Sequence, residues 1–177
     1  MSEEPHLTYG FEDPFGTPAG ERRLDRRLRG RLVAPVTVWT AGTSSERVGL
    51  SVSSVLVAEG EPPEILGLLD PLSDLRRVLE ETGVFVVHVL DETERRVASG
   101  FAGNYPADPF EGLEVNDTAY GPVMAGGRSV ISCRFSRAQG VGYQDLVTGT
   151  IEEIDLGAPA GPLTYYRGRF RRLAPEA

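Results

Sequence analysis

The sequence contains no lysine: all 18 of its cationic residues are arginine, set against 26 aspartates and glutamates. A Schiff base with pyridoxal phosphate needs a lysine amine, so enzymes of that kind are excluded. A complete Walker A phosphate loop needs a Gly-Lys-Ser/Thr sequence and is excluded as well. The positive charge that anchors any phosphate group must therefore come from arginines, which can form two parallel hydrogen bonds to it, or from backbone N–H groups.

Cysteine and histidine are almost as scarce. The single cysteine, Cys133, excludes an internal disulfide, leaves too few thiols for a cysteine-rich metal site, and fits a reducing compartment. The only two histidines are His6 and His88, too few for a histidine-cluster metal site. We therefore expect no metal centre.

Long apolar runs are also missing, because none reaches the roughly 20 residues that cross a bilayer. The first residues, 1–5, are acidic and lack the apolar stretch of a signal peptide. The net charge of −8 and the pI of about 4.8 argue against non-specific nucleic-acid binding, which needs a basic face. We expect a cytoplasmic protein with neither a nucleic-acid nor a membrane partner.

The 177 residues, 40% of them hydrophobic, suffice for one globular domain with a substantial core. Residues 1–20 combine glycine, proline and acids without an apolar period, which predicts a flexible arm before a domain of residues 21–177. Apolar periodicity predicts three short helices, over 21–32, 71–82 and 91–101. Alternation of β-branched residues predicts about seven strands, over 35–40, 48–58, 64–69, 84–90, 128–137, 146–155 and 163–173. Strands that follow strands favour an antiparallel barrel or sandwich.

Catalytic motifs are few. The glycines of 140–142 lack the third glycine of a dinucleotide-binding fingerprint, and no Gly-x-Ser-x-Gly elbow is present. No acidic pair has a spacing that singles out a general acid and base, so we assign no catalytic side chain. The stretch 49–54 places a glycine and three hydroxyls on a strand and at its end, which suits a phosphate or a polar ring edge. An ordinary serine-rich strand is the alternative.

Several segments have residues, and an order along the chain, that are similar to the motifs of one protein family. These segments are 31–40, 48–54 with the following Pro62-Pro63, 69–73, 83–90, 101–102, 108–112 and 161–170. In that order, from about residue 28 to 173, they resemble the flavin reductase-like family, the FMN-binding split barrels. The resemblance implies a mainly β fold, an antiparallel Greek-key split β-barrel with a few short flanking helices. It also implies a homodimer with FMN or FAD near its interface, and an NADH- or NADPH-dependent flavin oxidoreductase that passes a hydride from nicotinamide to flavin N5.

The resemblance further implies a set of cofactor-binding residues. These are Thr37, Trp39, Thr40, Ser51, Val52, Ser53, Ser54, Ser73, His88, Tyr166, Arg167 and Arg169. Because His88 and Trp39 lie on apolar strands, core positions are favoured for both over direct roles in the chemistry. The arginines of 21–31 are less favoured as phosphate anchors than Arg167 and Arg169.

The nicotinamide side departs from the family pattern. Tyr143 and Gln144 stand where the family's reductases often have aspartate and histidine. Glutamine can hydrogen-bond an amide but cannot titrate, and Tyr143 could stack on a ring. The hypothesis that the protein is a flavin reductase suggests a flavin-dependent monooxygenase as its partner. Two alternatives stay open: an FMN-binding protein without reductase activity, and a split-barrel interaction protein that has lost its flavin.

Overall fold

The computed structural model describes residues 24–103, 108–158 and 160–173, so the expected arm of residues 1–20 lies outside the described residues. Its helices are α1 (Leu24–Arg29), α2 (Asp74–Thr82) and α3 (Arg95–Phe101). Its strands are β1 (Ala34–Pro35), β2 (Thr37–Thr43), β3 (Glu46–Val52), β4 (Val55–Ala58), β5 (Glu64–Leu69), β6 (Val84–Val89), β7 (Val115–Thr118), β8 (Gly121–Met124), β9 (Ser129–Val141), β10 (Gln144–Asp155), β11 (Thr164–Tyr166) and β12 (Arg169–Arg171). None of the helices in these ranges is long and apolar enough to cross a membrane.

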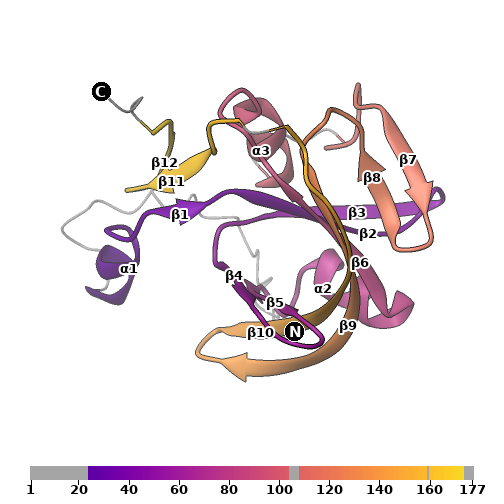
Figure 1. Cartoon of the computed structure of the whole chain (residues 1–177). Helices are drawn as coiled ribbons and strands as arrows, with labels where there is room; N and C mark the ends of the chain where they lie inside the picture. Colours follow the sequence, from indigo (N-terminus) through magenta and orange to yellow (C-terminus); the bar gives the residue numbers. More distant parts are fainter. Residues whose placement is uncertain (1–23, 104–107, 159, 174–177) are drawn as a thin grey trace, which may run out of the picture.

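The main sheet has seven strands in the order β3-β2-β6-β9-β10-β5-β4, with every neighbouring pair antiparallel. It curls into a half-barrel (Figure 1), which confirms the predicted split-barrel class. The single strand predicted over 48–58 is wrong, because the structure contains two strands there. β3 ends one edge of the sheet and β4 starts the other, so the chain crosses between the two edges at Ser53 and Ser54.

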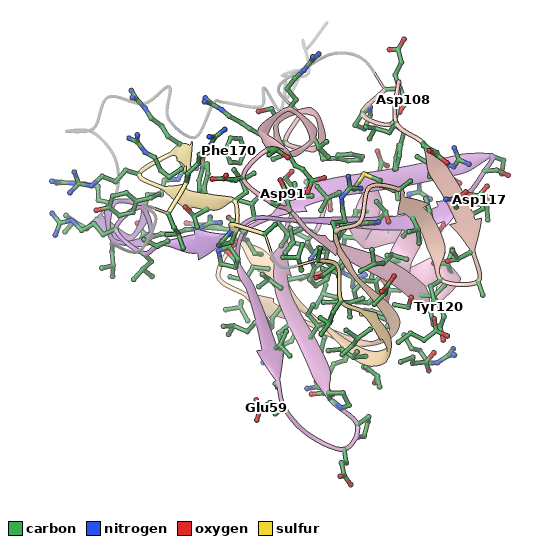
Figure 2. All side chains as sticks on the ribbon, turned by 45° about the horizontal axis from the view of Figure 1, so that its top comes forward. Glu59, Asp91, Asp108, Asp117, Tyr120 and Phe170 are labelled. Atoms are coloured by element: carbon green, nitrogen blue, oxygen red, sulfur yellow. The ribbon has the colours of Figure 1, made fainter. Side chains whose placement is uncertain are left out.

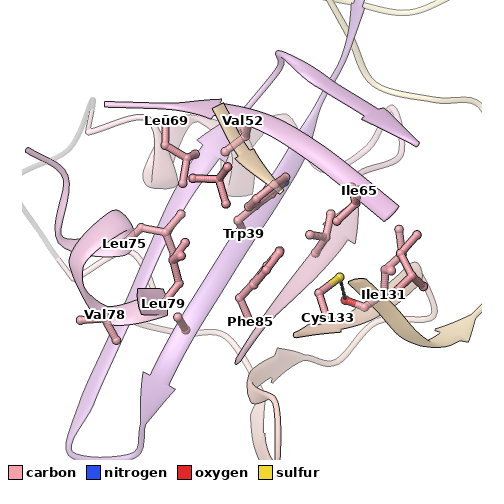
Figure 3. Packing of buried hydrophobic residues seen from close by; sticks show 14 residues of the cluster. Trp39, Val52, Ile65, Leu69, Leu75, Val78, Leu79, Phe85, Ile131 and Cys133 are labelled. Atoms are coloured by element: carbon pink, nitrogen blue, oxygen red, sulfur yellow. Dashed lines mark hydrogen bonds between the residues drawn. The ribbon is translucent and has the colours of Figure 1, made fainter. Parts of the chain in front are cut away.

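The inside of the half-barrel is filled by an aromatic pair. The rings of Trp39 and Phe85 stack with centroids 4.9 Å apart and planes 14° apart. A Cβ at position 67 would lie 2.6 Å from the Trp39 ring, so Gly67 is required for this packing. The apolar face of α2, with Leu75 and Leu79, closes the same cluster (Figure 3). Each fully buried large side chain of this kind contributes about 1.5–3 kcal/mol.

The other face of β2 and β6 is also covered, which explains their nearly continuous burial. Here α3 and β8 contribute Phe101 and Met124, and Phe110 meets the Phe101 ring edge-on at 4.9 Å. The hairpin of β7 and β8 lies within residues 102–127, which the sequence marks only as loop-rich. Asparagine, aspartate, glycine and proline within its strands hide the strand pattern.

A small sheet of order β1-β11-β12 lies beside α1 (Figure 1). The strand predicted over 163–173 is a hairpin, because Arg167 and Gly168 have φ values of +49° and +80° and turn the chain within two residues. The Arg167 N–H donates to the carbonyl of Gly30 at 3.0 Å. This bond fixes the end of α1 against the hairpin.

Candidate functional site

Three connections meet at one end of the half-barrel, and we call this place the candidate site. The first is the β3–β4 crossing, where the Ser54 carbonyl accepts a hydrogen bond from the Leu68 N–H at 3.0 Å. The second is the β5–α2 connection, which ends at Ser73. The third is the β9–β10 hairpin, whose Asp145 pairs with Leu69 at the end of β5. The crossing, the start of α2 and the base of the hairpin thus lie at one end of the sheet.

An arginine from a fourth element reaches this site. The Arg29 guanidinium donates a hydrogen bond to the Ser54 hydroxyl at 3.0 Å. The sequence favours Arg29 less than Arg167 and Arg169 as a phosphate anchor, because an arginine-rich amphipathic helix is typical of a solvated surface. The missing lysines direct attention to the arginines as a class. Only the folded chain shows that this one, 25 positions away, meets the serine.

Ser73 and the hairpin have their own partners. The Ser73 hydroxyl caps α2, accepting from the Arg76 N–H at 3.3 Å and donating to the Asp70 carbonyl at 2.8 Å. The Arg76 Nε donates to Asp145 at 2.9 Å, which ties α2 to the base of the β9–β10 hairpin. At the tip, Gln144 is half-buried and Tyr143 is 81% exposed. The hairpin thus has a fixed base and an accessible tip.

Four of the expected cofactor contacts lie inside the protein instead. Thr37, Trp39, Thr40 and Val52 are all buried. The Thr37 hydroxyl donates to the Val52 carbonyl at 2.7 Å and accepts from the Trp39 indole N–H at 3.1 Å. The Thr40 hydroxyl donates to the carbonyl of Pro122 at 2.6 Å. These side chains are engaged in the core, and their contacts with a cofactor stay predictions.

His88 is likewise fully buried, in the position that the sequence favours for it. Its Nε2 accepts the Met124 N–H at 3.1 Å, so the ring proton lies on Nδ1 and is donated to the Val38 carbonyl at 3.1 Å. Burial, assisted by the positive charge of Arg128, lowers the pKa of His88 to about 4. The ring is therefore neutral at pH 7 and holds β8 against β2 and β6.

The remaining expected residues separate into two groups. The Ser51 hydroxyl donates to the Ala98 carbonyl at 2.7 Å, so it fixes α3 to β3. Tyr166, Arg167 and Arg169 lie in the β11–β12 hairpin, with the Arg167 guanidinium 5.5 Å from the centre of the Tyr166 ring. The hairpin bond to Gly30 places Arg167 beside the end of the helix that carries Arg29.

The chemistry of the candidate site is that of a phosphate anchor next to an apolar surface. Ser53 and Ser54 are half-buried hydroxyls, and Arg29 adds a permanent positive charge with a planar set of donors. Leu56 on β4 and Leu72 before α2 are both more than 70% exposed. Hydroxyls with a guanidinium suit a phosphate monoester, and exposed leucines suit the face of a flat ring.

A comparison with protein families finds one family that matches most of the chain. A family model described as "Flavin reductase like domain" matches residues 29–174. The chain is 30% identical over 143 residues to the reductase component of 4-hydroxyphenylacetate 3-monooxygenase from Thermus thermophilus, covering 81% of this chain and 91% of that one. It is 31% identical over 170 residues to an NADH:riboflavin 5'-phosphate oxidoreductase from Streptomyces pristinaespiralis, covering 94% and 96% of the two chains.

Solved structures give the same result. An NADH:FAD oxidoreductase from Streptomyces globisporus, in complex with NAD and FAD fragments, superposes with a TM-score of 0.80 at 25% identity, covering 90% of this chain and 97% of that one. Component B of nitrilotriacetate monooxygenase from Mycobacterium thermoresistibile also superposes with a TM-score of 0.80 at 25% identity, covering 86% and 87%.

Proposed function

This chain belongs to the flavin reductase-like family and is an NAD(P)H-dependent flavin reductase, and we propose that it uses NADH to reduce FMN held at the candidate site. The contact between Arg29 and Ser54 is the observation that carries the placement of the flavin. A relative that covers 94% of the chain is named for NADH and riboflavin 5'-phosphate, which supports both choices. FAD and NADPH are the alternatives.

The residues of the candidate site fit a flavin. Arg29, Ser53 and Ser54 would hold the phosphate, and the exposed leucines beside them would take the apolar part of the ring. Arg167, next to the end of α1, would add a second positive charge. No lysine is needed for this set of donors. A bound flavin supplies the redox chemistry by accepting a hydride from the nicotinamide.

The chain's own residues would bind and orient rather than move protons. Gln144 would hydrogen-bond the nicotinamide amide, and the exposed ring of Tyr143 would stack on its face. His88 is buried and neutral in the core, so it is not available as a replacement for the missing histidine.

Assembly and context belong to the same proposal. The edge strand β4 exposes Leu56 and Val57, at 71% and 58%, and this apolar edge supports a homodimer. Relatives named as reductase components of monooxygenases support a flavin-dependent monooxygenase as the partner. We further propose a cytoplasmic location, with residues 21–177 as the working domain and 1–20 as an arm.

Oxidation of NADH tests the activity. The purified protein is expected to accelerate NADH consumption in the presence of FMN well above the background of flavin alone. Protein that is yellow when purified but inert toward NADH and NADPH would establish a flavin-binding protein without reductase activity. Colourless protein that leaves FMN fluorescence unquenched would establish an interaction protein that has lost its flavin.

A further inference from the structure

One end of the molecule concentrates positive charge. We call residues 24–33 and 164–173 the basic face; it holds eight of the 18 arginines and one carboxylate, Asp25. Its formal charge is thus +7, which leaves −15 for the rest of a chain whose net charge is −8. Figure 1 shows α1 beside β11 and β12, and Figure 2 shows nitrogen-tipped side chains gathered around them, near Phe170.

The described carboxylates do little to neutralise this charge. Within the described ranges, Arg172 is the only one of the eight arginines in ion-pair distance of a carboxylate, Glu92, at 3.7 Å. Arg29 instead bonds a serine, and Arg167 lies over a tyrosine ring. Like charges held close together repel one another and cost folding energy. A face that keeps this repulsion is suited to a ligand that brings the opposite charge.

The basic face also exposes apolar side chains, and this combination limits the kinds of ligand that can bind it. Leu24, Leu28 and Leu32 repeat at four-residue spacing and are 77%, 63% and 64% exposed, and α1 buries none of its residues. A nucleic acid would pair with the arginines through its phosphates but leave the leucines in water. Arginine combined with apolar side chains is the composition of protein interfaces.

A hollow of about 150 Å³ lies at the border of this surface. Its lining comprises Phe170, Arg171 and Arg172 of the basic face and Glu92, Thr93, Arg95 and Leu163 beside it. Three arginines against one carboxylate leave the lining with a net positive charge. Its size suits a single side chain, and its lining suits one with an apolar stem and an anionic tip. A glutamate of a docked protein has that form.

The position of the basic face relates it to flavin transfer. Arg29 connects it directly to Ser54 at the candidate site. A protein seated on this face would lie next to the flavin, where it could receive the reduced form before oxygen in the solvent reacts with it. We propose that the basic face docks an acidic patch of the monooxygenase component that accepts the reduced flavin; the partner's identity rests on the proposed function.

Two other occupants fit the observations less well. An anionic membrane would attract the arginines, but α1 has only six residues and the remaining charge of −15 would be repelled. A second copy placed symmetrically on this face would set +7 against +7. Both occupants are outcomes that the experiment below separates.

The test compares two double variants of equal net charge. Arg27→Glu with Arg171→Glu reverses charge on the basic face, and Arg134→Glu with Arg137→Glu does so on exposed arginines of the barrel. Each pair moves the net charge from −8 to −12, so the variants have the same net charge in different places. The barrel variant also loses the ion pairs of Arg134 with Glu152 and of Arg137 with Glu64, so its folding is checked by urea denaturation. The probe is the purified oxygenase component of a flavin-dependent monooxygenase cloned from the genome that encodes this chain. Biolayer interferometry at low and high salt is expected to show about 30-fold weaker binding for the face variant and less than about 3-fold for the barrel variant.

Several results would overturn the proposal. They are absence of oxygenase binding by the wild-type protein, equal losses in the two variants, conversion of a dimer to a monomer by the face variant alone, and binding to phosphatidylserine vesicles in place of the oxygenase. NADH:FMN turnover without the oxygenase reports separately on the proposed function. Turnover without docking contradicts only the docking surface, and docking without turnover contradicts only the reductase activity.

Discussion

The arginines of the barrel and those of the basic face have the same chemistry but different surroundings. Arg76 donates to Glu80 at 2.7 Å and to Asp145 at 2.9 Å, and its side chain is 12% exposed. Arg47, Arg77, Arg128, Arg134 and Arg137 also face carboxylates of their own chain. On the basic face, by contrast, Arg172 is the only arginine with such a partner among the described residues.

Arginines that pair with a carboxylate and arginines without such a partner serve different roles in this protein. A paired arginine joins elements that are distant in sequence, as Arg128 joins the loop after β8 to Glu94 before α3. An unpaired arginine keeps its charge available to a ligand or partner. Four expected outcomes, from the largest to the smallest, would sharpen or break this comparison.

The largest effect is expected from Arg128→Met. Arg128 and Glu94 are only 7% and 10% exposed, so the variant leaves a buried carboxylate without its counter-charge. We expect the free energy of unfolding to fall by about 3–5 kcal/mol, measured by urea denaturation. The double variant with Glu94→Leu should recover much of that loss. A single variant as stable as the wild type would remove the structural role assigned to paired arginines.

The pH dependence of stability tests the same buried region through His88. The pKa of His88 is lowered to about 4 in the folded protein, from 6.5 in the unfolded chain, so acid favours the unfolded state. The contribution is complete above pH 6.5 and is lost by about 1.4 kcal/mol per pH unit as the pH falls toward 4. Urea denaturation at a series of pH values gives the free energy of unfolding of each protein. Its dependence on pH should be steeper for the wild type than for His88→Gln between pH 6.5 and 4. Identical slopes would contradict the neutral, buried histidine.

An intermediate effect is expected from Arg29→Gln at the candidate site. Loss of a charged hydrogen bond to the phosphate should weaken FMN binding by about 1.5–3 kcal/mol, roughly 10- to 100-fold. Riboflavin lacks the phosphate, so its affinity should be unchanged. Arg31→Gln is the matched control, because Arg31 is exposed and has the same charge. Equal losses for FMN and riboflavin would show that Arg29 does not hold the phosphate.

The smallest effect is expected from Arg134→Ala. Arg134 pairs with Glu152 at 2.7 Å, but its side chain is 60% exposed. Exposed ion pairs contribute about 0–1 kcal/mol and are weakened by salt. Denaturation at low and high salt should show a loss below about 1 kcal/mol that shrinks as salt rises. A loss comparable to that of Arg128→Met would mean that burial does not set the value of these pairs.

Much of the fold was predictable because its signals are local. Alternating β-branched residues and the ordered family motifs predicted the split barrel that the structure contains. The second predicted helix, over 71–82, begins later than expected, because Ser73 caps it and its first residue is Asp74. The break between β3 and β4 was not predictable in this way. Its cause is the closure of a curled sheet, in which the two strands belong to opposite edges. No local pattern around Ser53 and Ser54 records that crossing.

The candidate site was predictable only in part, for a related reason. The serines of the crossing were selected from their own segment, but burial on both faces of β2 removed Thr37, Trp39 and Thr40 from the accessible surface. The strand itself was predicted, but the alternation of its residues alone does not reveal that α3 and β8 cover its second face. Arg29 was favoured less than Arg167 and Arg169 because its contact with Ser54 spans 25 residues, which no local pattern shows.

The sequence by itself determined that every cationic side chain counted in this protein is an arginine, and therefore that a positive charge on a phosphate comes from guanidinium or backbone N–H groups. It also determined an excess of acidic residues. The tertiary structure decided which arginines are neutralised within the chain and which remain available. Composition fixes the number of charges, but the interaction between two charges depends on their separation and burial, and these exist only once the chain has folded.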